Sequence, residues 1–181
     1  MVWQDNATGN YYINSKSSTT NGTNFKSTRN LSKSNGTSKF PQIESHRKVF
    51  YVIWKESTGG TDRIFFKEGP KDISTNTTEF GSMKKISSNG NVSNPRISAG
   101  TTHFSIAWIS NLANASFIGF YPLNFFEDSN NAIQVTKLTS RGNIAGVSIF
   151  GYDADTYCVW ESKQTSKSDI FFTKMSTRFF E

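Results

Sequence analysis

The segment Phe50-Tyr51-Val52-Ile53-Trp54 decides the fold, because a segment of the same kind occurs three more times in the chain. The 181 residues contain four tryptophans, which are separated by 51, 54 and 52 residues. Apolar runs also end at the other three, as Val2-Trp3, Phe104-Ser105-Ile106-Ala107-Trp108 and Tyr157-Cys158-Val159-Trp160. Self-similarity at a fixed period is the signature of a repeat protein. The chain is therefore predicted to consist of repeats of roughly 50 residues.

Two further landmarks keep register with the tryptophans. Thirteen residues before Trp54 and Trp108 stand Pro41-Gln42-Ile43 and Pro95-Arg96-Ile97, and Val147-Ser148-Ile149 takes this place before Trp160. An aromatic or aliphatic segment follows each tryptophan after a turn-forming stretch: Tyr11-Tyr12-Ile13, Ile64-Phe65-Phe66, Phe117-Ile118-Gly119-Phe120 and Ile170-Phe171-Phe172. Short aromatic runs bounded by Gly, Asn and Thr predict strands joined by turns.

A fourth strand per unit is predicted over Phe25 to Leu31, Phe80 to Ile86 and the segment ending at Leu138. Four antiparallel strands in roughly 50 residues are typical of a β-propeller blade. We therefore predict an all-β chain with about three and a half blades, belonging to a ring of about six or seven. The single partial domain 1–181 divides into an incomplete blade over 1–36, complete blades over 37–90 and 91–142, and a second incomplete blade over 143–181. Such a chain is expected to be a fragment of a longer protein, or to pair with a second chain that completes the ring.

Composition excludes several function classes. The net charge is +6, but the lysines mark no single stripe, so a nucleic-acid partner is not expected. No apolar run is long enough to span a membrane. The single cysteine, Cys158, excludes an internal disulfide framework and is predicted to be a small buried hydrophobe. His46 and His103 stand without other ligands at metal-binding spacing, so neither a metal nor a cofactor is predicted.

The segment Ser18-Thr19-Thr20-Asn21-Gly22-Thr23-Asn24-Phe25 resembles the Asp-box, Ser-x-Asp-x-Gly-x-x-Trp, of bacterial neuraminidase repeats. Ser18 and Gly22 match, Phe25 takes the place of Trp, and Thr20 replaces the Asp; at Ser74 to Phe80 only Phe80 remains in register. The wider unit is similar to the sialidase-like repeats of archaeal and bacterial surface proteins. In that family the Asp-box is a turn remote from any catalytic pocket, so the resemblance implies a structural role for Ser18, Thr20, Gly22 and Phe25.

The resemblance leaves two functions open. An exo-α-sialidase, a glycoside hydrolase, would need several arginines around one carboxylate, and the family uses a Tyr nucleophile. Of the six arginines Arg29, Arg47, Arg63, Arg96, Arg141 and Arg178, only Arg96 is a candidate, because it stands on a predicted inner strand. Its repeat equivalents Gln42 and Ser148 are predicted to face the same channel. Asp153 and Asp155 are predicted to serve a turn, and the tryptophans to pack between blades rather than stack on sugars.

The favoured function is therefore a non-catalytic, sialidase-like propeller that serves as an extracellular or cell-surface binding module for a glycan or protein ligand. An extracellular location is supported by N-glycosylation sequons at Asn6, Asn21, Asn30, Asn35, Asn76, Asn91 and Asn114. The alternative is an exo-α-sialidase or a fragment of one.

Overall fold

The computed structural model describes residues 1–46, 49–69, 80–87, 90–112, 115–124, 136–137, 143–164 and 167–176. In these ranges every regular element is a β-strand. Predictions that fall on Arg47, Arg141, Arg178, Asn76, Asn114 and the segment 74–79 lie outside the described residues.

The described residues form fourteen strands in four antiparallel sheets, one for each tryptophan. Sheet 1 consists of β1 (Val2–Asp5), β2 (Tyr12–Ser15) and β3 (Arg29–Asn30). Sheet 2 consists of β4 (Thr37–His46), β5 (Val49–Thr58), β6 (Thr61–Glu68) and β7 (Lys84–Lys85). Sheet 3 consists of β8 (Asn91–Ala99), β9 (His103–Leu112), β10 (Ala115–Asn124) and β11 (Thr136–Lys137). Sheet 4 consists of β12 (Asn143–Tyr152), β13 (Asp155–Gln164) and β14 (Lys167–Ser176).

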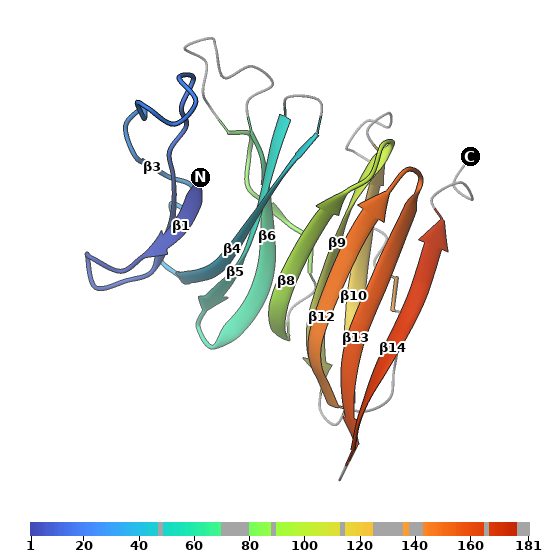
Figure 1. Cartoon of the computed structure of the whole chain (residues 1–181). Helices are drawn as coiled ribbons and strands as arrows, with labels where there is room; N and C mark the ends of the chain where they lie inside the picture. Colours follow the sequence, from blue (N-terminus) through green and yellow to red (C-terminus); the bar gives the residue numbers. More distant parts are fainter. Residues whose placement is uncertain are drawn as a thin grey trace.

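The sheets pack face against face in chain order, with sheet 1 at the left and sheet 4 at the right of Figure 1. The edge strand β8 contacts both β4 and β12, and β1 contacts β4, so one edge of each sheet lies on a common side of the row. Consecutive four-stranded sheets with converging inner strands are the arrangement of propeller blades. The prediction of an all-β chain with propeller blades is confirmed, and the described sheets form an open row.

Proline marks a bulge in two inner strands. The register of β4 shifts between Lys39 and Gln42, and that of β8 shifts between Ser93 and Arg96. The residue before each proline, Phe40 or Asn94, has a positive φ of 58° or 49°. A bulge on an edge strand is one of the few places where a sheet accepts proline, because the ladder needs no N–H there. This explains why Pro41 and Pro95 recur at one position of the repeat.

Two of the fourth strands are much shorter than predicted. β3 and β7 have two residues each, whereas the residues on both sides of β11 lie outside the described ranges. Beyond β3 and β7, a serine hydroxyl replaces the backbone acceptor: Ser32 Oγ accepts from the Ile13 N–H at 3.2 Å, and Ser87 Oγ accepts from the Ile64 N–H at 2.8 Å. Serine side chains compete in this way with backbone ladders. These two repeats therefore end their outer strands with the same side-chain hydrogen bond.

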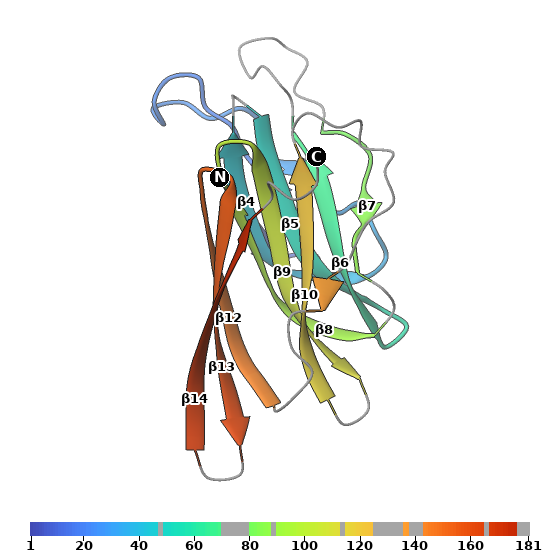
Figure 2. The same ribbon diagram turned by 90° about the vertical axis from the view of Figure 1, so that its right-hand side faces the viewer.

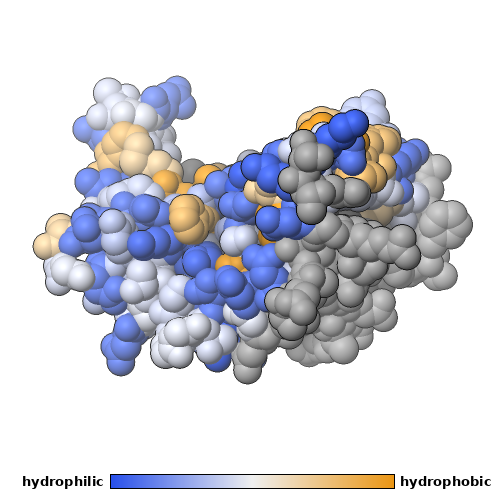
Figure 3. All heavy atoms as spheres, turned by 90° about the horizontal axis from the view of Figure 1, so that it is seen from below, coloured by the Kyte–Doolittle hydropathy of each residue, from blue (hydrophilic) through white to orange (hydrophobic). Residues whose placement is uncertain are grey.

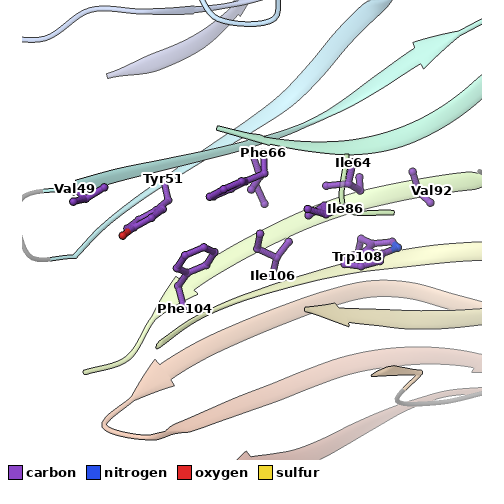
Figure 4. Close-up of a cluster of buried hydrophobic side chains, with 10 residues drawn as sticks. Val49, Tyr51, Ile64, Phe66, Ile86, Val92, Phe104, Ile106 and Trp108 are labelled. Atoms are coloured by element: carbon purple, nitrogen blue, oxygen red, sulfur yellow. The ribbon is translucent and has the colours of Figure 1, made fainter. Parts of the chain in front are cut away.

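Among the side chains that the structure describes, three apolar clusters join the sheets. We call the face that carries the tryptophan the back face of a sheet, and the opposite face its front face. Trp54 is buried against the front face of sheet 1, and Trp108 against the front face of sheet 2, where Tyr51 and Phe66 lie (Figure 4). Trp160 packs, partly buried, against the cluster between sheets 3 and 4, in which Cys158 is fully buried. These contacts confirm the predicted packing role for Trp54, Trp108 and Trp160, and the burial of Cys158.

No helix among the described residues is long and apolar enough to cross a membrane.

Candidate functional site

The predicted channel residues occupy one repeat position. Gln42 pairs with Ile53, Arg96 with Ala107, and Ser148 with Val159, which are in each case the residues before the tryptophans. Paired residues of an antiparallel ladder share a face, so all three side chains lie on front faces. The Arg96 guanidinium donates from Nη1 to its neighbouring Pro95 carbonyl at 3.1 Å. Of these three residues only Arg96 is cationic, and its exposure to a central channel stays a prediction.

Asp153 and Asp155 belong to the turn between β12 and β13. Tyr152 pairs with Asp155, which leaves Asp153 and Ala154 as the connecting residues, and Asp153 has a φ of 51°. The Asp153 carbonyl accepts from the Thr101 N–H at 2.8 Å, and Asp155 forms an ion pair of 2.8 Å with Lys174. These contacts serve the turn and its neighbours, which agrees with the turn predicted there.

A buried polar cluster joins sheets 3 and 4. His103 Nε2 lies 2.8 Å from Thr156 Oγ1, and this hydroxyl lies 2.7 Å from Ser105 Oγ. Burial lowers the pKa of His103; Asp155 raises it and His46 lowers it further. The imidazole is therefore held neutral beside these hydroxyls, inside the contact between the sheets. This is the chemistry of a satisfied buried histidine, and it joins two blades.

An apolar cavity of about 370 Å³ lies between sheets 1 and 2. Its apolar wall contains three phenylalanine rings, from Phe25, Phe50 and Phe80, together with Met1, Val2 and Ile43. Its polar wall contains Ser15, Lys16, Ser17, Ser18, Gly22, Ser27 and Arg29. A cavity with aromatic walls and a few converging polar groups is the usual form of a small-molecule site.

The Asp-box-like segment forms one wall of this cavity. Ser18 Oγ accepts hydrogen bonds from the Thr20 N–H at 3.1 Å and the Gly22 N–H at 3.0 Å. Thr20 Oγ1 accepts from the Asn24 N–H at 2.9 Å, and Gly22 has a φ of 83°. A hydroxyl that bonds its own turn, with glycine at positive φ, makes a compact turn. The turn brings Ser18, Gly22 and Phe25 to the cavity, where Phe25 is 45% exposed.

A second cavity of about 250 Å³ shares Arg29 and Phe80 with the first. Its remaining lining consists of Asn30, Leu31, Lys33 and Lys67. Burial lowers the pKa of Lys67, and the nearby charge of Lys33 lowers it further. Three cationic side chains therefore meet at this cavity without a carboxylate among its described lining. Such a site favours a ligand that carries negative charge.

The two cavities bring together aromatic, hydroxyl and cationic side chains. Their described linings contain no Asp, Glu, His, Tyr or Cys. Among the described residues no group of three His, Cys, Asp or Glu is placed to hold a metal ion. Sequence reasoning assigned Phe25 to architecture alone and missed Phe50, Phe80 and the cations. The sequence offered one signal for this cavity. Phenylalanine recurs at the start of two of the predicted fourth strands, as Phe25 and Phe80.

The fold defines the class of protein as a partial β-propeller. Comparisons with protein-family models and with curated sequences find no match. The chain is similar to a solved GH32 β-fructofuranosidase from Bombyx mori, with a TM-score of 0.49 and 12% identity over 92% of this chain. It spans about 40% of the length of that enzyme. An exo-1,5-α-L-arabinanase from a bovine ruminal metagenomic library has a TM-score of 0.38 and 11% identity, over 97% of this chain and 92% of its own.

Proposed function

We propose that the chain is a non-catalytic, sialidase-like propeller module that binds an acidic glycan in the cavity between sheets 1 and 2. The observation that carries the proposal is the lining of this cavity: aromatic rings and hydroxyls, with cations at one side and no carboxylate among the described residues. An extracellular or cell-surface location belongs to the proposal, supported by the exposed sequons at Asn6, Asn21, Asn35 and Asn91.

The rings and hydroxyls fit the two sides of a sugar. A pyranose has apolar C–H faces, which pack on rings such as Phe25, and an edge of hydroxyls, which need hydrogen-bonding partners. Ser15, Ser17, Ser18 and Ser27 supply hydroxyls that donate and accept. The Ser18 hydroxyl is already held by its turn, so it is oriented before a ligand arrives.

The cations select an acidic sugar over a neutral one. Arg29 stands in the lining of both cavities, and a guanidinium binds a carboxylate through two parallel hydrogen bonds. Lys33 and Lys67 lie on the same side and repel each other, which a bound anion relieves. Sialic acid, with one carboxylate on a pyranose, has this combination of charge and apolar face.

The experiment is a titration of the protein with sialyllactose, with lactose as the neutral comparison, followed by calorimetry or NMR shifts. We expect binding of sialyllactose and little binding of lactose. Arg29→Gln removes the carboxylate partner and is expected to weaken binding about 10- to 100-fold. Phe25→Ala is expected to weaken it about fivefold or more, because a stacking ring is lost.

Matched controls lie outside the cavities. Phe40 is an exposed phenylalanine on β4, and Arg63 is a half-buried arginine on β6; neither lines the cavities. Phe40→Ala and Arg63→Gln are expected to leave the affinity unchanged. Equal binding of lactose and sialyllactose would contradict the role of the cations. Turnover of a fluorogenic sialoside that is abolished by Arg96→Ala would replace the binding module with an exo-α-sialidase.

A further inference from the structure

The second cavity lies between the outer strand of sheet 1 and β6 of sheet 2. In Figure 2 the inner strands β4 and β12 lie on one side of the row of sheets, and β6 and β7 lie on the other. The second cavity is therefore separate from the inner strands that carry Gln42, Arg96 and Ser148. Its described lining consists of Arg29, Asn30, Leu31, Lys33, Lys67 and Phe80.

Lys67 places a cation in the contact between two sheets. It pairs with Val52, which is fully buried in the cluster between sheets 1 and 2, so the Lys67 side chain starts on the back face of sheet 2. Burial and the charge of Lys33 lower the pKa of Lys67. Glu68, the next residue, pairs with Tyr51 on the front face, where burial and the charge of Glu68 raise the pKa of Tyr51 to about 12. The carboxylate nearest in sequence therefore acts on the other side of the sheet.

Lys33 is brought to the second cavity by an uncommon backbone conformation. Its φ is 42°, a region that residues with a side chain seldom adopt. Asn30 Oδ1 holds this turn, because it accepts from the Lys33 N–H at 2.9 Å and from the hydroxyl of the buried Ser32 at 3.2 Å. A backbone of this kind costs free energy and persists only where its surroundings hold it, and such residues cluster at binding sites. The loop after β3 thus presents a cation from a fixed turn.

The sign of its charges distinguishes the second cavity from the rest of the surface. Most of the described surface seen from below is hydrophilic (Figure 3), so polarity alone marks no site. Lys55 and Lys174 each lie 2.8 Å from an aspartate. Arg29, Lys33 and Lys67 instead meet at a cavity whose described lining contains no carboxylate. Like charges gathered in this way favour an anion that comes from outside the chain.

One acid group does not account for the cations of both cavities. The first cavity adds Lys16 to Arg29, so four cationic side chains line the two cavities together. A carboxylate held by Arg29 in the first cavity leaves Lys33 and Lys67 facing each other, since these two lysines line only the second cavity. Arg29 and Phe80 belong to both linings, so one ligand can extend along this shared wall from the first cavity into the second.

We propose that the second cavity binds a second acid group of the same ligand, which is then an oligosaccharide with acid groups on two neighbouring residues. This inference rests on the proposed function of the first cavity. Arg29 holds the first carboxylate through two parallel hydrogen bonds, and the second carboxylate accepts from the ammonium groups of Lys33 and Lys67. Because the two acid groups belong to one molecule, binding of the first raises the effective concentration of the second.

The test compares disialyllactose, which carries two linked sialic acids, with sialyllactose by isothermal titration calorimetry. We expect disialyllactose to bind the original protein at least about 10-fold more tightly. Its affinity is also expected to fall more steeply with rising salt, because more charges are paired in the complex. The pKa of Lys67, followed by NMR of its side chain, is expected to rise when disialyllactose binds, since an anion offsets the charge of Lys33.

Lysine variants assign the gain in affinity to the second cavity. Lys33→Gln and Lys67→Gln are each expected to remove most of the advantage of disialyllactose and to weaken sialyllactose no more than about threefold. Lys67→Arg keeps the charge and is expected to keep the advantage. Lys67→Gln removes a partly desolvated cation, so it is expected to be at least as stable as the original protein, which thermal unfolding checks. Lys33 is exposed, so Lys33→Gln is expected to stay folded as well.

Lys84→Gln is the matched control. Lys84 is also a half-buried lysine of sheet 2, but it pairs with Phe66 on the front face and lines neither cavity. An equal loss in Lys84→Gln and Lys67→Gln would show a general attraction by net charge and would overturn the inference. Equal binding of the two ligands by the original protein, or an advantage that survives in Lys33→Gln and Lys67→Gln, would overturn the inference and leave the proposed function standing. Binding of neither ligand would refute both.

Discussion

His103 of sheet 3 and Thr156 of sheet 4 are joined by a hydrogen bond of 2.8 Å between buried residues. The Thr156 hydroxyl also contacts Ser105, so a short polar chain runs through the otherwise apolar contact between two blades. Such a network holds the two sheets in one relative position only while the imidazole is neutral, because an imidazolium there would be charged and desolvated.

The stability of the fold is expected to depend on pH through His103. Burial lowers the pKa of His103 below its usual 6.5, so below pH 6.5 the unfolded chain binds a proton that the folded chain does not. The contribution of neutral His103 to the free energy of unfolding is complete above about pH 6.5. It is lost as the pH falls toward the folded-state pKa, and the free energy of unfolding then changes by at most about 1.4 kcal/mol per pH unit. Urea unfolding at several pH values measures it.

His103→Gln is expected to lower stability at pH 7.5 and to flatten the dependence on pH. The nearby charges act in opposite directions, since Asp155 raises the pKa and His46 lowers it. His46→Asn therefore serves as the comparison, with a smaller change in slope. If the free energy of unfolding changed with pH in the same way in the original protein and in His103→Gln, a group other than His103 would control the loss of stability in acid.

The tryptophans between sheets are expected to dominate the stability of the row. Trp54→Ala and Trp108→Ala each leave a large cavity in a fully buried cluster, and the expected loss is about 3–5 kcal/mol. Trp3→Ala, at the partly covered end, is expected to cost clearly less. Chemical denaturation measures all three. Soluble, cooperatively folding Trp54→Ala and Trp108→Ala proteins of unchanged stability would refute the packing role.

Two glycines of β12 provide a matched pair. A Cβ on Gly151 would lie 2.6 Å from the Ala99 carbonyl carbon and 2.7 Å from the Gly100 nitrogen, which are backbone atoms of the neighbouring sheet. Gly151→Ala is therefore expected to push sheets 3 and 4 apart, at a cost of about 1–3 kcal/mol. A Cβ on Gly146 meets nothing within 4 Å, so Gly146→Ala is expected to stay within about 0.5 kcal/mol. Thermal unfolding measures the stability of both variants. Equal shifts of the melting temperature in Gly151→Ala and Gly146→Ala would contradict the close approach of the two sheets at Gly151.

The sequons are expected to differ in occupancy when the chain is secreted from a eukaryotic host. Asn6, Asn21, Asn35 and Asn91 are exposed and are expected to carry glycans. Asn30 is partly buried, and its Oδ1 accepts hydrogen bonds from the Lys33 N–H at 2.9 Å and the Ser32 hydroxyl at 3.2 Å. We expect Asn30 to stay unmodified. Peptide mass mapping reads each position, and a glycan at Asn30 would contradict its structural role.

The repeat could be predicted from the sequence because each unit solves the same packing problem. Trp54 and Trp108 must fill the same gap between two sheets, so residue type and spacing are both retained. Proline at the inner strands could be placed as well, since Pro41 and Pro95 keep a constant distance to the tryptophans.

The cavity could not be predicted, because it depends on how two sheets and a loop lie relative to one another. Phe25, Phe50 and Phe80 come from three separate segments, and the recurrence of Phe25 and Phe80 does not show that Phe50 lies beside them. The short outer strands were missed for a local reason. Periodicity indicated strands from Phe25 and Phe80 onward, but side-chain hydrogen bonds of Ser18, Ser32 and Ser87 take up the backbone groups instead.

The bulges at Pro41 and Pro95 have a consequence for aggregation. An exposed sheet edge invites another chain to add a strand, and a proline in a bulge protects the edge by removing a donor and bending the strand. β12 has a bulge between Ile144 and Gly146, but it carries Val147 where β4 and β8 carry proline. The edge of β12 therefore keeps the backbone N–H of Val147, which stands close to the apolar residues Ile149 and Phe150. We therefore expect any misassembly of this protein to begin on β12, while β4 and β8 stay protected.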